Sequence, residues 1–142
     1  MDREKLAENI LTIVPFMFKK LRKVFPPSGI SKQQLELLFH INHEDRKPMN
    51  FYSEKMMVPK SNLTVISDKL IMEGLIERVF DPNDRRIIIL KITKKGIEYL
   101  GEYKKIIIRE MKKKLDSLNN DDIKRLNELI GEMKIIFNKI DQ

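Results

Sequence analysis

The stretch EGLIERVFDPNDRRIIILKIT, at residues 73–93, decides the fold that we expect for this chain. Two segments rich in β-branched and apolar residues, 75–80 and 87–92, flank the sequence DPND at 81–84. Asp, Pro and Asn favour turns because each suits a specific turn position. The pattern predicts a β-hairpin with a charged tip.

A well-marked helix start lies upstream of this hairpin. Ser31 followed by Gln34 forms a capping box, in which each residue satisfies a backbone N–H of the other. We expect this helix to end near residue 42 and to be followed by a polar loop over 43–47 and a short helix over about 51–57. The residues expected on the buried side of the first of these helices are Leu35, Leu38 and Phe39.

Another helix is predicted directly before the hairpin. Pro59 suits the first position of a helix, and Gly74 suits the position just after its end. The helical period places Leu63, Ile66 and Leu70 on its inner face. The opposite, outward face carries Lys60, Ser61, Asn62, Thr64, Val65 and Asp68.

Long helices with apolar faces are expected at both ends of the chain. The first, over 2–24, has two apolar rows, of which the main one is Leu6, Ile10, Ile13 and Met17. Thr93 is expected to cap a second helix, and Asn119 caps a third. That third helix has an a/d seam at Ile123, Leu126, Ile130, Met133, Phe137 and Ile140. Because a small monomer rarely covers so many apolar faces, these residues predict dimerisation.

The order of these elements predicts a mainly α, winged helix-turn-helix fold. Three helices form a DNA-binding core, the β-hairpin is its wing, and long N- and C-terminal helices serve dimerisation. In such motifs the second helix of the helix-turn-helix enters the DNA major groove. We expect a single domain over 1–142, with the winged helix-turn-helix lobe at 31–93 and dimerisation helices at 1–25 and 94–142.

The wing carries the remaining candidate DNA-binding residues. Arg85 at the tip suits the narrow minor groove, and Arg78 and Arg86 lie nearby in sequence. Asp84 is expected to orient Arg86 through a bidentate pair, because a carboxylate matches the fork of a guanidinium. On the outward face of the preceding helix, short polar side chains suit hydrogen bonds to base edges.

The chain resembles the MarR-type transcriptional regulators. The resemblance is carried by ISxxQ at 30–34, SNLT at 61–64, LxxEGLIER at 70–78, DPNDRR at 81–86 and ITxxG at 92–96. These motifs span about residues 30 to 100, and their succession in one order is far more specific than any one of them. The outer helices match the family in pattern alone.

The resemblance implies a homodimeric protein that binds a pseudo-palindromic operator in double-stranded DNA. Such regulators usually repress, and many release DNA when a small anionic or phenolic effector binds between the dimer helices and the DNA-binding lobe. In that family the first and last helices form the dimer interface.

Four places depart from the family pattern. Tyr52 and Ser53 stand where a Leu-Ala pair is usual, and Met57 stands where a Gly is common. Pro59 replaces the usual Ser or Asn cap, and Val65 replaces a basic or small residue.

Composition restricts the other classes of function. The 142 residues include 28 Lys+Arg and 21 Asp+Glu, and the net charge of +7 is compatible with a polyanionic partner. Absence of Cys excludes disulfides, thiolate metal sites and a cysteine nucleophile. No apolar stretch is long enough to span a bilayer, and the N-terminus does not match a signal peptide. We therefore expect a cytoplasmic protein with no membrane partner.

An enzyme is not expected. The sequence has no Gly-rich phosphate loop and no Ser/His/Asp order, and a hydrolase using Asp45, Asp81 and Asp84 would lack a base or a metal set. His40 and His43 lie near acidic residues, but two His in a loop setting make a poor metal site. We expect no cofactor and no metal.

A winged-helix module that binds a protein partner, without DNA binding, remains as an alternative. Its contact helix would be expected to expose an apolar face. Here that face is mostly polar, because it carries Ser61, Asn62 and Thr64, and this favours DNA binding over binding of a protein partner.

Overall fold

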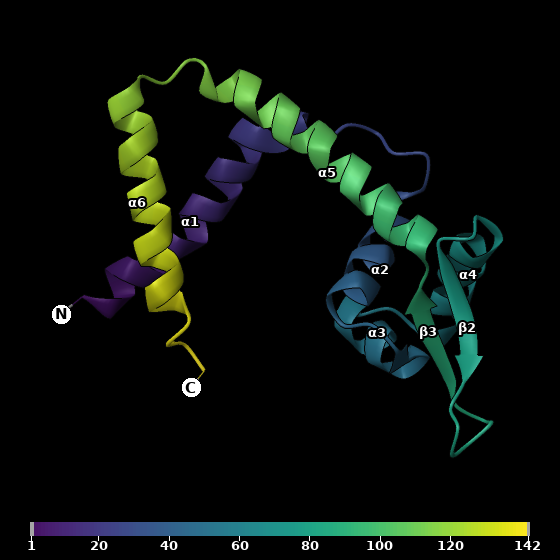
Figure 1. Ribbon diagram of the computed structural model, residues 1–142. Helices are drawn as coiled ribbons and strands as arrows, with labels where there is room; N and C mark the ends of the chain where they lie inside the picture. Colours follow the sequence, from purple (N-terminus) through teal and green to yellow (C-terminus); the bar gives the residue numbers. More distant parts are fainter. Residues whose placement is uncertain (1, 142) are drawn as a thin grey trace. The chain divides into compact units, whose positions relative to one another are not determined.

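The computed structural model describes residues 2–141 of the chain. In chain order its elements are α1 (Arg3–Leu21), the 3₁₀ helix η1 (Arg22–Val24), α2 (Lys32–His43), β1 (Lys47–Pro48), α3 (Met49–Met56), α4 (Lys60–Met72), β2 (Ile76–Phe80), β3 (Ile88–Ile92), α5 (Lys94–Leu115) and α6 (Asn120–Phe137) (Figure 1). This mainly helical architecture, with a small antiparallel sheet and long terminal helices, confirms the predicted winged helix-turn-helix fold.

The chain forms two compact units, which we call the winged-helix unit and the terminal-helix unit. The winged-helix unit comprises residues 26–106, and the terminal-helix unit comprises the chain before 26 and after 106. The lobe predicted at 31–93 lies inside the winged-helix unit. That unit also takes in the first half of α5, where Leu100 and Tyr103 are buried.

The core of the winged-helix unit is built from α2, α3, α4 and the sheet. On α2 the buried residues are Leu37, Leu38 and Ile41, whose spacing of three and four places them on one face. The prediction that Phe39 is buried was wrong, since its side chain is 43% exposed. Leu35 is half-buried at the edge of the core. The buried face of α2 is therefore rotated from the predicted one, although the Ser31 capping box is present as expected.

The hairpin is confirmed, but the sheet has a third strand. β2 and β3 pair antiparallel, with Arg78 opposite Leu90 in the register. The two-residue strand β1 pairs with the other edge of β3, in the order β1-β3-β2. The polar loop predicted over 43–47 is therefore shorter at both ends, because His43 is the last residue of α2 and Lys47 belongs to β1. The short helix α3 follows β1 directly and begins at Met49, two residues earlier than predicted.

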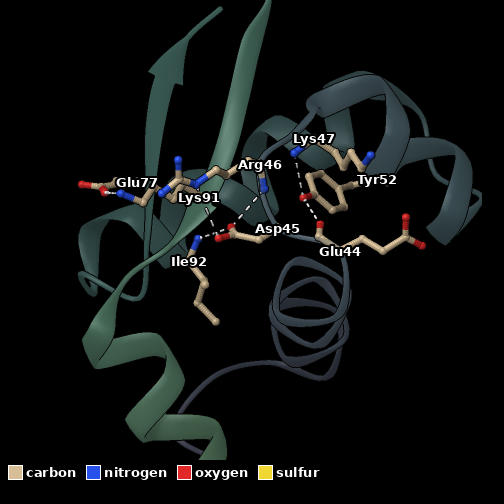
Figure 2. A network of polar contacts seen from close by, with 8 residues as sticks. All are labelled: Glu44, Asp45, Arg46, Lys47, Tyr52, Glu77, Lys91 and Ile92. Carbon is tan, nitrogen blue, oxygen red and sulfur yellow. Dashed lines mark hydrogen bonds and ion pairs between the residues drawn. The ribbon is translucent and has the colours of Figure 1, made fainter.

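The turn before β1 is held by Asp45 (Figure 2). One carboxylate oxygen of Asp45 accepts hydrogen bonds from the backbone N–H of Ile92, at 2.9 Å, and of Arg46, at 3.0 Å. Arg46 adopts a positive φ of 63°, which turns the chain sharply into β1. The Arg46 N–H also donates to the Leu90 carbonyl at 3.1 Å, so this turn is attached to β3.

Tyr52, on α3, bonds to the backbone on both sides of the turn that precedes β1. Its hydroxyl donates to the Glu44 carbonyl at 2.5 Å and accepts from the Lys47 N–H at 3.2 Å, as Figure 2 shows. The side chain is fully buried, and this burial raises the pKa of Tyr52 to about 12. A buried hydroxyl with two partners is satisfied, which explains how Tyr52 stands at a position where an apolar residue is usual.

The ITxxG motif has a structural explanation. The Thr93 hydroxyl donates to the Gly74 carbonyl at 2.6 Å and accepts from the Gly96 N–H at 3.0 Å, so the predicted cap of α5 is confirmed. Gly96 lies so close to the chain at the start of β2 that a Cβ there would meet the carbonyl oxygen of Leu75, the residue before β2, at 2.1 Å. Only glycine permits this approach of α5 to the strand.

The terminal helices contrast with this core. α1 begins after the Asp2 cap and contains no buried residue, and neither does α6. α1 ends at Leu21, before the predicted end at 24, and continues as η1. Ile140 lies in the turn after α6, which shortens the predicted seam. None of the helices in residues 2–141 combines the length and apolarity that a membrane span requires.

Candidate nucleic-acid interface

Helix α4 is fixed to the core by one face. Leu63 and Leu70 are fully buried, and Ile66 is 6% exposed, which confirms the predicted inner face. Ser67 is also buried, and its hydroxyl donates to the Thr64 carbonyl at 3.0 Å. This burial could not be predicted, because a serine whose hydroxyl bonds to its own helix has no signature in the sequence pattern.

The start of α4 differs by one residue from the prediction. Pro59 is the N-cap and not the first helical residue, with φ −62° and ψ 153°. Lys60 therefore opens the helix. Proline supplies no side-chain acceptor, so no side chain caps the first backbone N–H groups of α4.

The outward face of α4 has the exposure that the period predicts. The six candidate residues there are all exposed: Lys60, Ser61, Asn62, Thr64, Val65 and Asp68. The Thr64 hydroxyl donates to the Lys60 carbonyl at 3.0 Å, which occupies its polar atom and leaves its methyl group free for contact. Val65 is 71% exposed, so this polar face includes one apolar side chain.

The wing turn is organised by two aspartates. Asp81 accepts from the backbone N–H of Asn83 at 2.8 Å. Asp84 receives two bonds from the Arg86 guanidinium, at 3.0 and 3.1 Å, which confirms the predicted bidentate pair. The pair lowers the pKa of Asp84 and raises that of Arg86. Arg85 is exposed at the tip, and no ion pair involving it is found in residues 2–141.

Asp68 and Arg78 contact each other. The guanidinium Nη2 of Arg78, on β2, donates to the Asp68 carboxylate, on α4, at 2.6 Å. Both residues were predicted to be DNA-binding, and their pairing could not be read from the spacing of ten residues. Their charges cancel, as do those of Asp84 and Arg86, so the net positive charge of these candidates rests on Lys60 and Arg85.

The structure brings three of the predicted residues together around a shallow hollow of about 200 Å³. Lys60 and Thr64 from α4 and Arg86 from the wing line it, together with Asn50 from the first turn of α3. The remaining lining residues are Pro48, Met49, Ile87 and Ile88, so none is acidic. The sequence did not indicate Asn50, because its position beside α4 depends on the path of the chain through β1.

Within the described residues, no three His, Asp or Glu side chains gather in a way that could hold a metal ion. The chemistry of this surface is instead that of hydrogen-bond donors, two exposed arginines at the wing turn and a lysine at a helix start. Such groups bind phosphate and base edges.

Residues 30–88 match the sequence model of the MarR family. The chain is 27% identical over 114 residues to the uncharacterized HTH-type transcriptional regulator YdgJ of Bacillus subtilis, covering 80% of this chain and 70% of that protein. It is 30% identical over 97 residues to the HTH-type transcriptional repressor MdtR of Bacillus subtilis, covering 66% of this chain and 63% of that protein.

A solved structure, that of the transcriptional regulator Tm0710 from Thermotoga maritima, is similar over almost its whole length. Its TM-score is 0.77 at 29% identity, with 95% of this chain and 96% of that chain covered. The family match covers the capping box of α2, the whole of α4 and the wing turn, whose geometry is described above. On these findings the chain belongs to the MarR family of winged helix-turn-helix transcriptional regulators.

Proposed function

We propose that this chain is a homodimeric, sequence-specific DNA-binding repressor that releases its operator when it binds a small ligand. One observation carries the DNA-binding part. The inner face of α4 is buried in the core, whereas its polar outer face is exposed, and the wing carries an exposed arginine. This is the arrangement of a helix that enters the major groove while a wing reaches the minor groove.

The exposed residues divide into two roles. Lys60 and Arg85 carry net positive charge, so they contribute mainly Coulomb attraction to phosphates. Asn62 and Thr64 lie on the outer face of α4, where an amide can pair with adenine and a methyl group can contact thymine. The first pair positions the protein, and the second pair reads sequence.

The homodimer is supported by the apolar residues of the terminal helices. The side chains predicted for dimerisation that remain exposed in the single chain are Leu6, Ile13, Met17, Ile123, Leu126, Ile130, Met133, Phe137 and Ile140. Ile10 is half-buried. A second copy related by a two-fold axis would cover such rows. The operator would then contain two half-sites about 10–10.5 bp apart, one helical turn, centre to centre.

Repression is supported by the relative MdtR, which is named a transcriptional repressor. Release by a small anionic or phenolic effector is a property of the family that we extend to this chain. Salicylate, which is both anionic and phenolic, is a suitable probe. Titration of salicylate into the complex should lower operator affinity; unchanged affinity up to millimolar concentration would contradict the effector proposal.

The decisive experiment begins by sequencing the DNA fragments that the purified protein retains. Affinity for the selected operator and for a scrambled duplex is then measured at several salt concentrations. Lys60→Ala and Arg85→Ala should lower the affinity for the operator and for the scrambled duplex alike. Each should reduce the magnitude of the log-affinity versus log-salt slope by roughly 1 per monomer. Asn62→Ala should cost about 1–3 kcal/mol on the operator alone, with the slope nearly unchanged.

Folding of each variant is checked by far-UV circular dichroism. If wild-type protein enriches no sequence, and if the three variants bind duplex DNA like the wild type, the DNA-binding proposal is wrong. The alternative, a winged-helix module that binds a protein partner, would then be favoured, because the exposed Val65 offers it an apolar contact.

A further inference from the structure

The contact between Asp68 and Arg78 joins the two elements that the proposed function brings to DNA. Asp68 lies in the third turn of α4, and Arg78 lies in the middle of β2. The ion pairs found in residues 2–141 otherwise lie within one helix, within a turn, between β2 and β3, or between α2 and α3. The 2.6 Å bond is therefore the one ion pair among them that connects α4 to the wing.

The position of this pair along β2 matters for the wing. Apolar packing between α4 and β2 is concentrated at the start of the strand, where Ile76 is buried against the core that includes Leu70. Further out, Val79 is half-buried and Phe80 is 64% exposed, so the outer part of the wing has little apolar support. Arg78 lies where the strand leaves the core, and its bond to Asp68 fixes the base of the wing.

The charges of the pair also indicate that Arg78 serves Asp68 and not a separate phosphate contact. A free carboxylate on the outer face of α4 would repel phosphates, at a cost that increases as water is excluded from the interface. The bonded Arg78 cancels that charge. Because its guanidinium is held by α4, Arg78 is not an independent phosphate contact like Arg85. The two side chains are 54% and 35% exposed, so the pair adds little to stability by itself.

We propose that Asp68 and Arg78 form a positioning pair that sets the angle of the wing against α4, so that base reading and minor-groove insertion occur together. This inference rests on the proposed DNA binding. It differs from the expectation that each residue contacts DNA separately. Its consequence is that loss of the pair lowers affinity for the operator more than affinity for DNA of unrelated sequence.

The test uses variants with matched charge. The double variant Asp68→Asn with Arg78→Gln has the same net charge as the wild type but no ion pair. The exchange of Asp68→Arg with Arg78→Asp also keeps the net charge and can restore the pair. Binding to the selected operator and to a scrambled duplex is measured for both, together with the salt dependence of each affinity and with hydroxyl-radical footprints of the minor groove.

We expect the double variant to bind the operator about 10-fold more weakly, a change that corresponds to about 1.4 kcal/mol. Its affinity for the scrambled duplex and its salt slope should equal those of the wild type. Minor-groove protection next to each half-site should weaken, and the exchange variant should recover part of the operator affinity. Arg78→Gln should lose at least as much operator affinity as the double variant, because it also leaves the Asp68 carboxylate unpaired.

Independent charge effects would overturn the proposal. In that case Asp68→Asn would strengthen binding to both duplexes, Arg78→Gln would weaken both, and the double variant would bind like the wild type. A uniform loss on both duplexes, accompanied by a lower melting temperature, would also overturn it, because that would show a merely structural role. Absence of any operator binding by the wild type would instead contradict the proposed function itself.

Discussion

The two units of the chain differ in how much apolar surface they bury by themselves. The winged-helix unit contains a contiguous core in which Leu37, Leu63 and Leu90 are completely buried. In the terminal-helix unit, α1 and α6 bury no residue, although both helices carry apolar rows. Burial of apolar area is the main favourable term in folding. The first unit is thus complete in one chain, whereas the second has the composition of an interface that needs a partner.

The strongest way to break the winged-helix unit is to fill its closest backbone approach. Gly96→Ala places a Cβ at 2.1 Å from the Leu75 carbonyl oxygen, and since that atom is backbone, α5 must shift away from β2. We expect a loss of about 3 kcal/mol in the free energy of unfolding. Urea denaturation, followed by circular dichroism, measures this.

Gly101 provides a matched control in the same helix. A Cβ at Gly101 meets nothing within 4 Å, so Gly101→Ala should raise stability by up to about 1 kcal/mol through helix propensity. If Gly96→Ala unfolds with the same midpoint as Gly101→Ala, the close packing of α5 on the strand is not a determinant of stability.

The second prediction addresses the terminal-helix unit. Ile130→Lys introduces a charge into the apolar row of α6, and Glu128→Lys introduces the same residue on the opposite side of the helix. Ile130→Lys should raise the dimer dissociation constant about 100-fold, as expected for a central interface residue worth 2–4 kcal/mol. Glu128→Lys should leave the constant within about threefold. Sedimentation equilibrium measures both.

The effect on the winged-helix unit separates the two regions. All three tyrosines of the chain, Tyr52, Tyr99 and Tyr103, belong to the winged-helix unit, and the chain has no Trp. Near-UV circular dichroism from tyrosine therefore reports this unit. Its spectrum should be unchanged in the Ile130→Lys monomer; loss of the signal would show that the core of the winged-helix unit depends on the dimer.

The sequence allowed most of the local structure to be predicted, because local structure here follows from local rules. The Ser31 capping box, the hairpin around DPND and the two faces of α4 depend on residues within four positions of each other or on simple periods. The strand β1 was missed because two residues form no pattern. It exists through its pairing with Leu90 and Ile89, more than forty residues away.

The candidate site was predicted as a set of residues but not as a set of contacts. The outward face of α4 and the Asp84–Arg86 pair follow from spacing within one element. The bond between Asp68 and Arg78 and the place of Asn50 beside Lys60 require three elements to meet, which periodicity cannot show. Similarly, the burial of Phe39 was predicted wrongly because Leu35, Leu38 and Phe39 form a second apolar row at helical spacing, beside the true buried face of α2.

The third prediction uses the pH dependence of the buried Tyr52. Its pKa is about 12 in the folded chain, against 10.0 in the unfolded chain. Since the folded pKa is the higher one, the contribution is fully present below pH 10 and is lost as pH rises to about 12. Tyr52→Phe removes this contribution and leaves the Glu44 carbonyl and the Lys47 N–H without their partner.

We expect Tyr52→Phe to lower stability by about 1–3 kcal/mol at pH 7, the cost of unpaired buried polar groups. The difference from the wild type should shrink as pH rises from 10 to 12. Urea denaturation between pH 7 and pH 11.5 measures both quantities. A difference that stays constant over this range would show that the hydroxyl does not ionise more easily in the unfolded chain.

The smallest expected effect concerns Met57, the residue after α3. Met57 adopts φ 56° and ψ 41°, a left-handed conformation that costs most residues about 1–2 kcal/mol but costs glycine almost nothing. Its side chain is 90% exposed, so glycine removes little packing. Against this gain, glycine adds about 0.4–1 kcal/mol of entropy to the unfolded chain. Met57→Gly should therefore stabilise the winged-helix unit by about 0.5 kcal/mol.

Gly74 provides the control. It has φ +74° after α4, and Gly74→Ala should shift the urea midpoint in the opposite direction. Lower stability of Met57→Gly would mean that the exposed methionine contributes through a contact absent from the single chain, such as bound DNA or the second protomer.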